Sequence, residues 1–169
     1  QRQMCIRDSL AHYLDLYNKW SSYVPEKDGV MIAYASIYGN TKKAAELLYD
    51  KLKAKNVDVI ITDLARCDMS KAISDAFAYS KLVLATPTYN ADVFPFMRTF
   101  IEGLTERNYQ KRTVAFIENG AWAPMAAKVM AGMFEKSKEL NILDKTVKIT
   151  CALNDASVAQ IDELADELA

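Results

Sequence analysis

Three short segments of this sequence combine hydroxyl, amide, glycine and aromatic residues, and each follows an apolar run. The first, residues 36–41, reads SIYGNT and precedes a stretch with helical periodicity. Backbone amides at the start of a helix, together with the helix dipole, attract anions. Gly39 lets the backbone approach a ligand closely. Ser36, Asn40 and Thr41 can donate further hydrogen bonds. The segment predicts an anion site; a plain turn with Asn40 or Thr41 as helix N-cap is the alternative.

The second segment, residues 86–92, adds ring surface and an amide group. It reads TPTYNAD, and Phe94 lies two residues beyond its end. Tyr89 and Phe94 offer flat apolar surface that suits an isoalloxazine or a nucleobase, and Asn90 can both donate and accept hydrogen bonds. A turn in which Asp92 caps the next helix is the alternative interpretation.

The third segment, residues 118–124, reads ENGAWAP and places a glycine, polar groups and Trp122 close together. The indole could stack on a ligand or anchor the loop as a partly buried side chain, and both interpretations stay open. Taken together, the three segments predict one phosphate cradle and groups for one planar ring.

The apolar pattern around these segments alternates between strand and helix. The pattern predicts strands over residues 30–35, 57–62, 81–85, 113–118 and 146–152. It predicts helices over residues 10–24, 41–55, 70–79, 93–107, 124–140 and 155–168. This alternation indicates an α/β fold with a doubly wound five-stranded parallel sheet of order 2-1-3-4-5. Ligands of such sheets bind beyond the carboxyl ends of the strands, where all three segments lie.

The first segment matches neither of the common nucleotide-binding motifs. It contains neither G-x-x-x-x-G-K-[ST] nor G-x-G-x-x-G, and no arginine or lysine lies within it. In a doubly wound fold, a phosphate monoester held by neutral donors alone is typical of a flavin mononucleotide (FMN) site.

Composition narrows the class of protein. The 169 residues are 51% apolar with a net charge of −1, which argues for one folded domain and against a nucleic-acid or membrane partner. His12 is the single histidine, so a metal site built from several imidazoles is excluded. The three cysteines form no C-x-x-C pair. We therefore expect a soluble cytoplasmic protein with no metal site in this chain.

The chain is expected to have three parts. Residues 1–9 lack periodicity and resemble translated adapter sequence, so they are interpreted as non-native. Residues 10–28 are interpreted as a remnant helix and linker from a missing N-terminal domain. Residues 29–169 are predicted to form the ligand-binding domain.

The sequence resembles the flavodoxin-like domain of flavodiiron proteins, the A-type flavoproteins. The motifs that carry the resemblance are VMIAYASIYGNTKKAAELL, TPTYN and ENGAWAP. The likeness covers residues 30–169, and the upstream segment 13–20 with Pro25 is similar to the helix and linker that join the family's two domains. The resemblance implies a flavodoxin-like fold and non-covalently bound FMN.

The same resemblance assigns the cofactor contacts. The phosphate is expected on the first segment, at Ser36, Tyr38, Gly39, Asn40 and Thr41. The ribityl chain and ring are expected on the other two, at Thr86, Pro87, Thr88, Tyr89, Asn90, Asn119, Gly120, Ala121 and Trp122. Most flavodoxins have a Ser or Thr at position 38, so Tyr38 must act there through its backbone amide.

The resemblance also implies a function as an electron-transfer module. A rubredoxin-type protein would reduce the bound FMN, which would pass electrons to a diiron oxygen or nitric-oxide reductase domain that this chain lacks. In the family that diiron site belongs to the neighbouring subunit of a head-to-tail homodimer. An electron carrier of this kind needs no catalytic acid or base from the protein.

Three other interpretations were weighed. An NAD(P)H-dependent FMN or quinone reductase shares the fold and remains the alternative. A signalling receiver is rejected, because it needs acids where this chain has Ala35-Ser36 and Thr86, and a lysine near Cys151-Ala152. A fragment that has lost its ligand also stays open.

Overall fold

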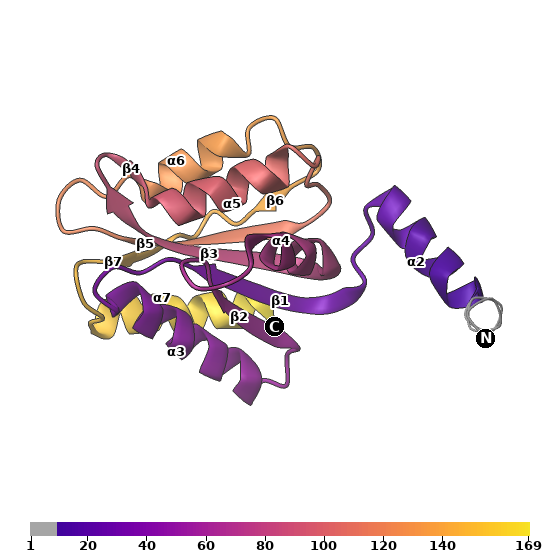
Figure 1. Ribbon diagram of the computed structural model, residues 1–169. Coiled ribbons are helices and arrows are strands. Elements are labelled where there is room, and N and C mark those ends of the chain that lie inside the picture. Colours follow the sequence, from indigo (N-terminus) through magenta and orange to yellow (C-terminus); the bar gives the residue numbers. More distant parts are fainter. Residues whose placement is uncertain (1–9) are drawn as a thin grey trace.

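In the computed structural model, which describes residues 10–169, a β-sheet lies between two layers of helices (Figure 1). Five of its strands are parallel to one another: β1 (Lys27–Tyr34), β2 (Val59–Asp63), β3 (Tyr79–Tyr89), β5 (Thr113–Asn119) and β7 (Val147–Ile149). They are arranged as β2-β1-β3-β5 with β7 beside β5. This arrangement confirms the predicted doubly wound order 2-1-3-4-5. Residues 1–9, interpreted above as non-native, lie outside the described part of the chain.

Helices cover both faces of the sheet. On one face lie α3 (Asn40–Ala54) and α7 (Asp155–Leu168), and on the other lie α4 (Met69–Ala78), α5 (Pro95–Thr105) and α6 (Ala126–Met133). Residues 30–34 of β1 and 82–85 of β3 are apolar and buried, because helices cover both faces of the sheet. Successive β1 residues therefore enter different cores: Met31 packs with α4 to α6, and Ile32 packs with α3 and α7.

Helices α3 and α7 begin and end within one residue of their predicted bounds. In α3 the predicted inward face, Ala44, Ala45, Leu48 and Leu52, is completely buried. A reciprocal capping box between Asn154 and Ser157 starts α7 at its predicted first residue.

The second half of the chain departs from the prediction. The helix predicted over 124–140 is confined to Ala126–Met133, and the chain then forms β6 (Asn141–Ile142) beside the start of β5. Residues 135–139 read EKSKE and offer no apolar face to extend the helix. The last strand is also shorter than predicted, because Cys151 adopts a left-handed φ of 67° just beyond β7.

The N-terminal helix α2 (Leu10–Ser22) projects from the sheet domain (Figure 1). Its predicted apolar face is exposed, and none of its residues is buried. The indole of Trp20 donates a 2.6 Å hydrogen bond to Glu26 beyond the helix. The helix ends where Tyr23 adopts a φ of 57°, so it is shorter than the predicted 10–24. Within residues 10–169, no helix is long and apolar enough to cross a membrane.

A buried arginine fixes the linker after α2 to the sheet domain. Arg112 is 4% exposed and donates to the carbonyl of Tyr23 in the linker, at 2.5 Å. It also donates to the carbonyls of Phe77 at 2.6 Å and Tyr79 at 2.9 Å. Phe77 lies in the last turn of α4, where the helix dipole favours a cation. The guanidinium thus joins three segments through backbone oxygens.

We expect Arg112→Met to lower the free energy of unfolding by about 3 kcal/mol, because three carbonyl groups lose a charged donor. Urea denaturation measures the change. Arg66→Met, at an 85% exposed side chain, is the matched control and should change stability by less than about 0.5 kcal/mol. Equal stability of the two variants would show that the Arg112 contacts contribute little.

Candidate functional site

A cavity of about 250 Å³ opens at the carboxyl edge of the sheet, where the winding reverses between β1 and β3. The loops that follow β1, β3, β5 and β7 supply its walls. The lining residues are Ser36, Ile37, Tyr38, Asn40, Thr41, Pro87, Thr88, Asn119, Gly120, Ala121 and Cys151. The structure therefore brings residues of all three predicted segments to one site.

The start of α3 forms one side of this cavity without a side-chain cap. Gly39 occupies the N-cap position with a left-handed φ of 86°, and its amide donates to Ser36 Oγ at 3.1 Å. The alternative in which Asn40 or Thr41 caps the helix is therefore wrong. Among the described residues, the amides of Asn40, Thr41 and Lys42 have no hydrogen-bond acceptor. Free amides at the positive end of a helix dipole form an anion site.

Asn119 ties this helix start to two other loops. Its side chain is 8% exposed and donates to Thr41 Oγ1 at 3.3 Å and to the carbonyl of Cys151 at 3.2 Å. Thr41 is 2% exposed. The amide group of Asn119 therefore holds the loops after β1, β5 and β7 in one arrangement around the cavity.

The hydroxyl of Thr88 connects the second segment to the third. Thr88 Oγ1 accepts hydrogen bonds from the amides of Met125 at 3.0 Å and Ala126 at 3.2 Å, and so caps α6 from β3. A hydroxyl group has two lone pairs and one proton. Because both lone pairs are used, the Thr88 hydroxyl can act toward the cavity only as a donor.

The third segment is held tightly at its base. Buried Glu118 accepts a 3.0 Å hydrogen bond from the amide of Ala127, also at the start of α6. Gly120 donates to the carbonyl of Ile149 at 3.0 Å. A Cβ on Gly120 would lie 3.3 Å from both Pro124 and Thr88, so the loop packs closely there. The segment thus has a rigid base below its exposed tip.

Five predicted contact residues do not line the cavity: Gly39, Thr86, Tyr89, Asn90 and Trp122. Gly39 shapes the helix start instead. Thr86 is completely buried in the sheet. Tyr89 is half exposed and packs edge-to-face against Phe94, with ring centroids 5.6 Å apart.

Asn90 belongs to a two-residue hairpin turn between β3 and β4 (Asp92–Val93). Asn90 and Ala91 have φ values of 52° and 58°, as a type I′ turn requires. Asp92 does not cap α5, as the alternative expected, but pairs with Arg98. That ion pair lowers the pKa of the Asp92 carboxyl below its ordinary value.

Two aromatic side chains stand free around the cavity. Tyr38 is 91% exposed and Trp122 is 89% exposed. The interpretation of Trp122 as a partly buried anchor is therefore wrong. Such exposed rings provide apolar surface that a planar ligand could cover.

Two lining residues were absent from the predicted set. Ile37 lies between predicted contacts in the first segment. Cys151 follows the last strand, whose loop reaches the same carboxyl edge as the other three. Ligands of parallel sheets bind beyond the carboxyl ends of the strands, and this rule, applied to the fifth strand, predicts Cys151 in the lining.

The fold and the position of the cavity define a doubly wound α/β protein with a ligand site at the carboxyl edge of its sheet. The family model described as flavodoxin matches residues 32–154, and the chain belongs to that family. An uncharacterized protein of Methanocaldococcus jannaschii is 30% identical over 159 residues, which cover 92% of this chain and 40% of that protein. The anaerobic nitric oxide reductase flavorubredoxin of Salmonella paratyphi B is 27% identical over 117 residues, covering 68% of this chain and 24% of that protein. The chain thus spans two fifths or less of these relatives.

Solved structures show the same fold. The flavodiiron protein from Giardia intestinalis superposes with a TM-score of 0.87 at 15% identity, covering 95% of this chain and 40% of that one. A Streptococcus pneumoniae flavodoxin superposes with a TM-score of 0.70 at 22% identity, covering 82% of this chain and 96% of that one. The first match is long enough to include part of α2.

We expect Asn119→Ala to destabilise the protein by about 1–2 kcal/mol, because Thr41 Oγ1 and the carbonyl of Cys151 lose the Asn119 amide group as their donor. Thermal or urea unfolding measures the effect. Asn141→Ala, at an exposed position in β6, is the control and should be close to neutral. Equal effects of the two substitutions would contradict the role of Asn119 in joining the loops.

Proposed function

We propose that this chain binds FMN without a covalent bond and serves as an electron-transfer domain. The phosphate is placed at the start of α3, on Ser36, Asn40, Thr41 and the backbone amides around Tyr38 and Gly39. The ribityl chain and the ring are placed along Pro87, Thr88, Asn119, Gly120 and Ala121, with Tyr38 and Trp122 beside the ring. Membership of the flavodoxin family supports this cofactor.

The single observation that carries the proposal is the uncapped start of α3. Free amides need an acceptor, and the α3 dipole favours a negatively charged one. No acidic side chain lines the cavity to compete for them. The Thr88 hydroxyl already accepts two hydrogen bonds, so it can only donate toward the cavity. It therefore also favours a ligand that offers oxygen or nitrogen acceptors.

When bound, FMN supplies electron transfer in steps of one or two electrons. The protein's own residues bind and orient the cofactor. The α3 start holds the charged end, and the rigid base of the third segment fixes one wall. The exposed rings of Tyr38 and Trp122 would offer apolar surface to the ring of the cofactor.

We further propose that the electrons pass to a diiron oxygen or nitric-oxide reductase domain in a longer protein. The support is the superposition on a flavodiiron protein that extends into α2, and the relative named as a nitric oxide reductase flavorubredoxin. A rubredoxin-type protein is the proposed donor, the cytoplasm the proposed compartment, and a head-to-tail homodimer the proposed assembly.

The visible absorption spectrum of purified protein tests cofactor binding. We expect flavin bands, with FMN and not FAD released on denaturation. Colourless protein that fails to take up added FMN would contradict the proposal.

Adding NADPH without oxygen separates the carrier from the alternative, an NAD(P)H-dependent reductase. A carrier keeps its flavin oxidised, whereas rapid bleaching would identify the reductase.

We expect Asn40→Asp to weaken FMN binding at least about tenfold, because a carboxylate beside the free amides repels the phosphate. The same carboxylate should stabilise the FMN-free protein slightly by interacting with the α3 dipole. Flavin fluorescence titration and thermal unfolding measure the two effects. Asn141→Asp, far from the cavity, is the matched control. Unchanged FMN affinity in Asn40→Asp would show that the phosphate lies elsewhere.

A further inference from the structure

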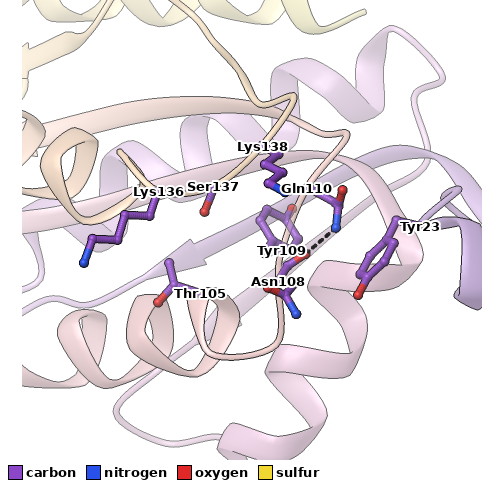
Figure 2. Close-up of a pocket in the computed structure, with 8 residues that line it drawn as sticks. All are labelled: Tyr23, Thr105, Asn108, Tyr109, Gln110, Lys136, Ser137 and Lys138. Carbon is purple, nitrogen blue, oxygen red and sulfur yellow. Dashed lines mark hydrogen bonds between the residues drawn. The ribbon is translucent and has the colours of Figure 1, made fainter.

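A second cavity, of about 390 Å³, lies at the opposite end of the sheet from the candidate FMN site. Figure 2 shows its lining, with Tyr109 near the centre and Lys136 and Tyr23 on opposite sides. The walls come from the loop between α5 and β5, the loop after α6, and the linker after α2. The lining residues are Tyr23, Thr105, Asn108, Tyr109, Gln110, Lys136, Ser137 and Lys138.

This lining is polar and cationic. Lys136 and Lys138 are both among the lining residues, and neither forms an ion pair within the described residues. None of the lining residues is acidic. The side chains of Asn108, Gln110 and Ser137 add amide and hydroxyl donors. An anionic ligand would meet several donors there and no opposing carboxylate.

The nearby end of α5 does not cancel this positive charge. The carbonyls of its last turn would repel an anion if they were free. Instead Leu104 O accepts from the amide of Tyr109 at 3.1 Å, and Thr105 O accepts from the amide of Asn108 at 3.1 Å. Gly103 O accepts from Arg107 at 2.8 Å. The carbonyl oxygens are therefore occupied within the protein.

One of the lining residues, Tyr109, carries a hydroxyl group without a partner among the described residues. Tyr109 is completely buried, and its hydroxyl makes no hydrogen bond with any described residue. Its ring is fixed by an edge-to-face contact with Phe77, with centroids 5.2 Å apart. Burial raises the pKa of this hydroxyl above its ordinary value, so it stays neutral and can donate. A buried unpaired hydroxyl is destabilising unless a ligand or a water molecule accepts its proton.

We propose that this cavity is a second binding site, which takes a small molecule carrying a phosphate monoester. Lys136 and Lys138 neutralise its two negative charges, and Asn108, Gln110 and Ser137 donate to its oxygens. The Tyr109 hydroxyl, which has no partner among the described residues, is assigned to one phosphate oxygen as a further donor. A cavity of this size suits a small metabolite, and the ring of Tyr23 offers apolar surface to the rest of it. The proposal does not depend on FMN binding.

Nuclear magnetic resonance titration of the full chain tests this site, with inorganic phosphate and adenosine monophosphate as probes. We expect saturable shifts in the amide signals of Gln110 and Ser137. The shifts should persist in Asn40→Asp, which separates this site from the start of α3. Adenosine and sodium chloride at equal ionic strength serve as uncharged and ionic controls. Signals that move only around Gly39, or that never saturate, would overturn the proposal.

Substitutions identify the groups that bind. The double variant Lys136→Gln/Lys138→Gln should weaken phosphate binding at least about tenfold. The control double variant Lys53→Gln/Lys148→Gln also loses two exposed charges and should bind normally. Unweakened binding in the first double variant would overturn the site.

Tyr109→Phe tests the unpartnered hydroxyl separately. We expect binding to fall about fivefold while the unfolding midpoint of the ligand-free protein stays equal or rises. A merely structural tyrosine would show the change in stability without the loss of binding. Unchanged binding by Tyr109→Phe would therefore remove the hydroxyl from the proposed site.

Discussion

The free backbone amides at the start of α3 are the constraint on which the rest of the candidate site depends. They exist because Gly39 adopts a left-handed conformation at the N-cap position, where no side chain supplies an acceptor. Serine, threonine, asparagine or aspartate at an N-cap would normally satisfy one of them. These amides without an acceptor lie at the edge of the sheet where ligands of parallel α/β proteins bind. An anion from outside the chain is the acceptor that fits.

Hydrogen bonds between different loops hold the arrangement around the start of α3. Asn119 joins the loops after β1, β5 and β7, and Thr88 with Glu118 caps α6 from two neighbouring strands. The polar atoms nearest the cavity are therefore largely occupied on their protein side. The free amides at the start of α3 and the hydroxyl of Thr88 remain as donors toward the cavity. These donors favour a ligand that offers hydrogen-bond acceptors.

The sequence predicted the parts that follow from local chemistry. Alternating apolar runs predicted the strand order, and the i, i+4 spacing of Ala44, Leu48 and Leu52 predicted the buried face of α3. The length of α6 was not predictable in the same way, because β6 forms only through pairing with β5. The exposure of single side chains was harder to predict than the strand order. Nothing in the ENGAWAP segment indicates that the side chain of Trp122 is exposed to solvent. Asn90 was attributed to ring binding, although a hairpin turn accounts for it.

The exposed face of α2 and the second cavity lie away from the proposed cofactor, so neither bears on the central claim about the α3 start. Comparing riboflavin with FMN tests that claim most directly, because the two differ only in the phosphate. We expect the cofactor-free protein, titrated by quenching of flavin fluorescence, to bind FMN at least about 100-fold more tightly than riboflavin. Equal affinity for the two flavins would contradict it.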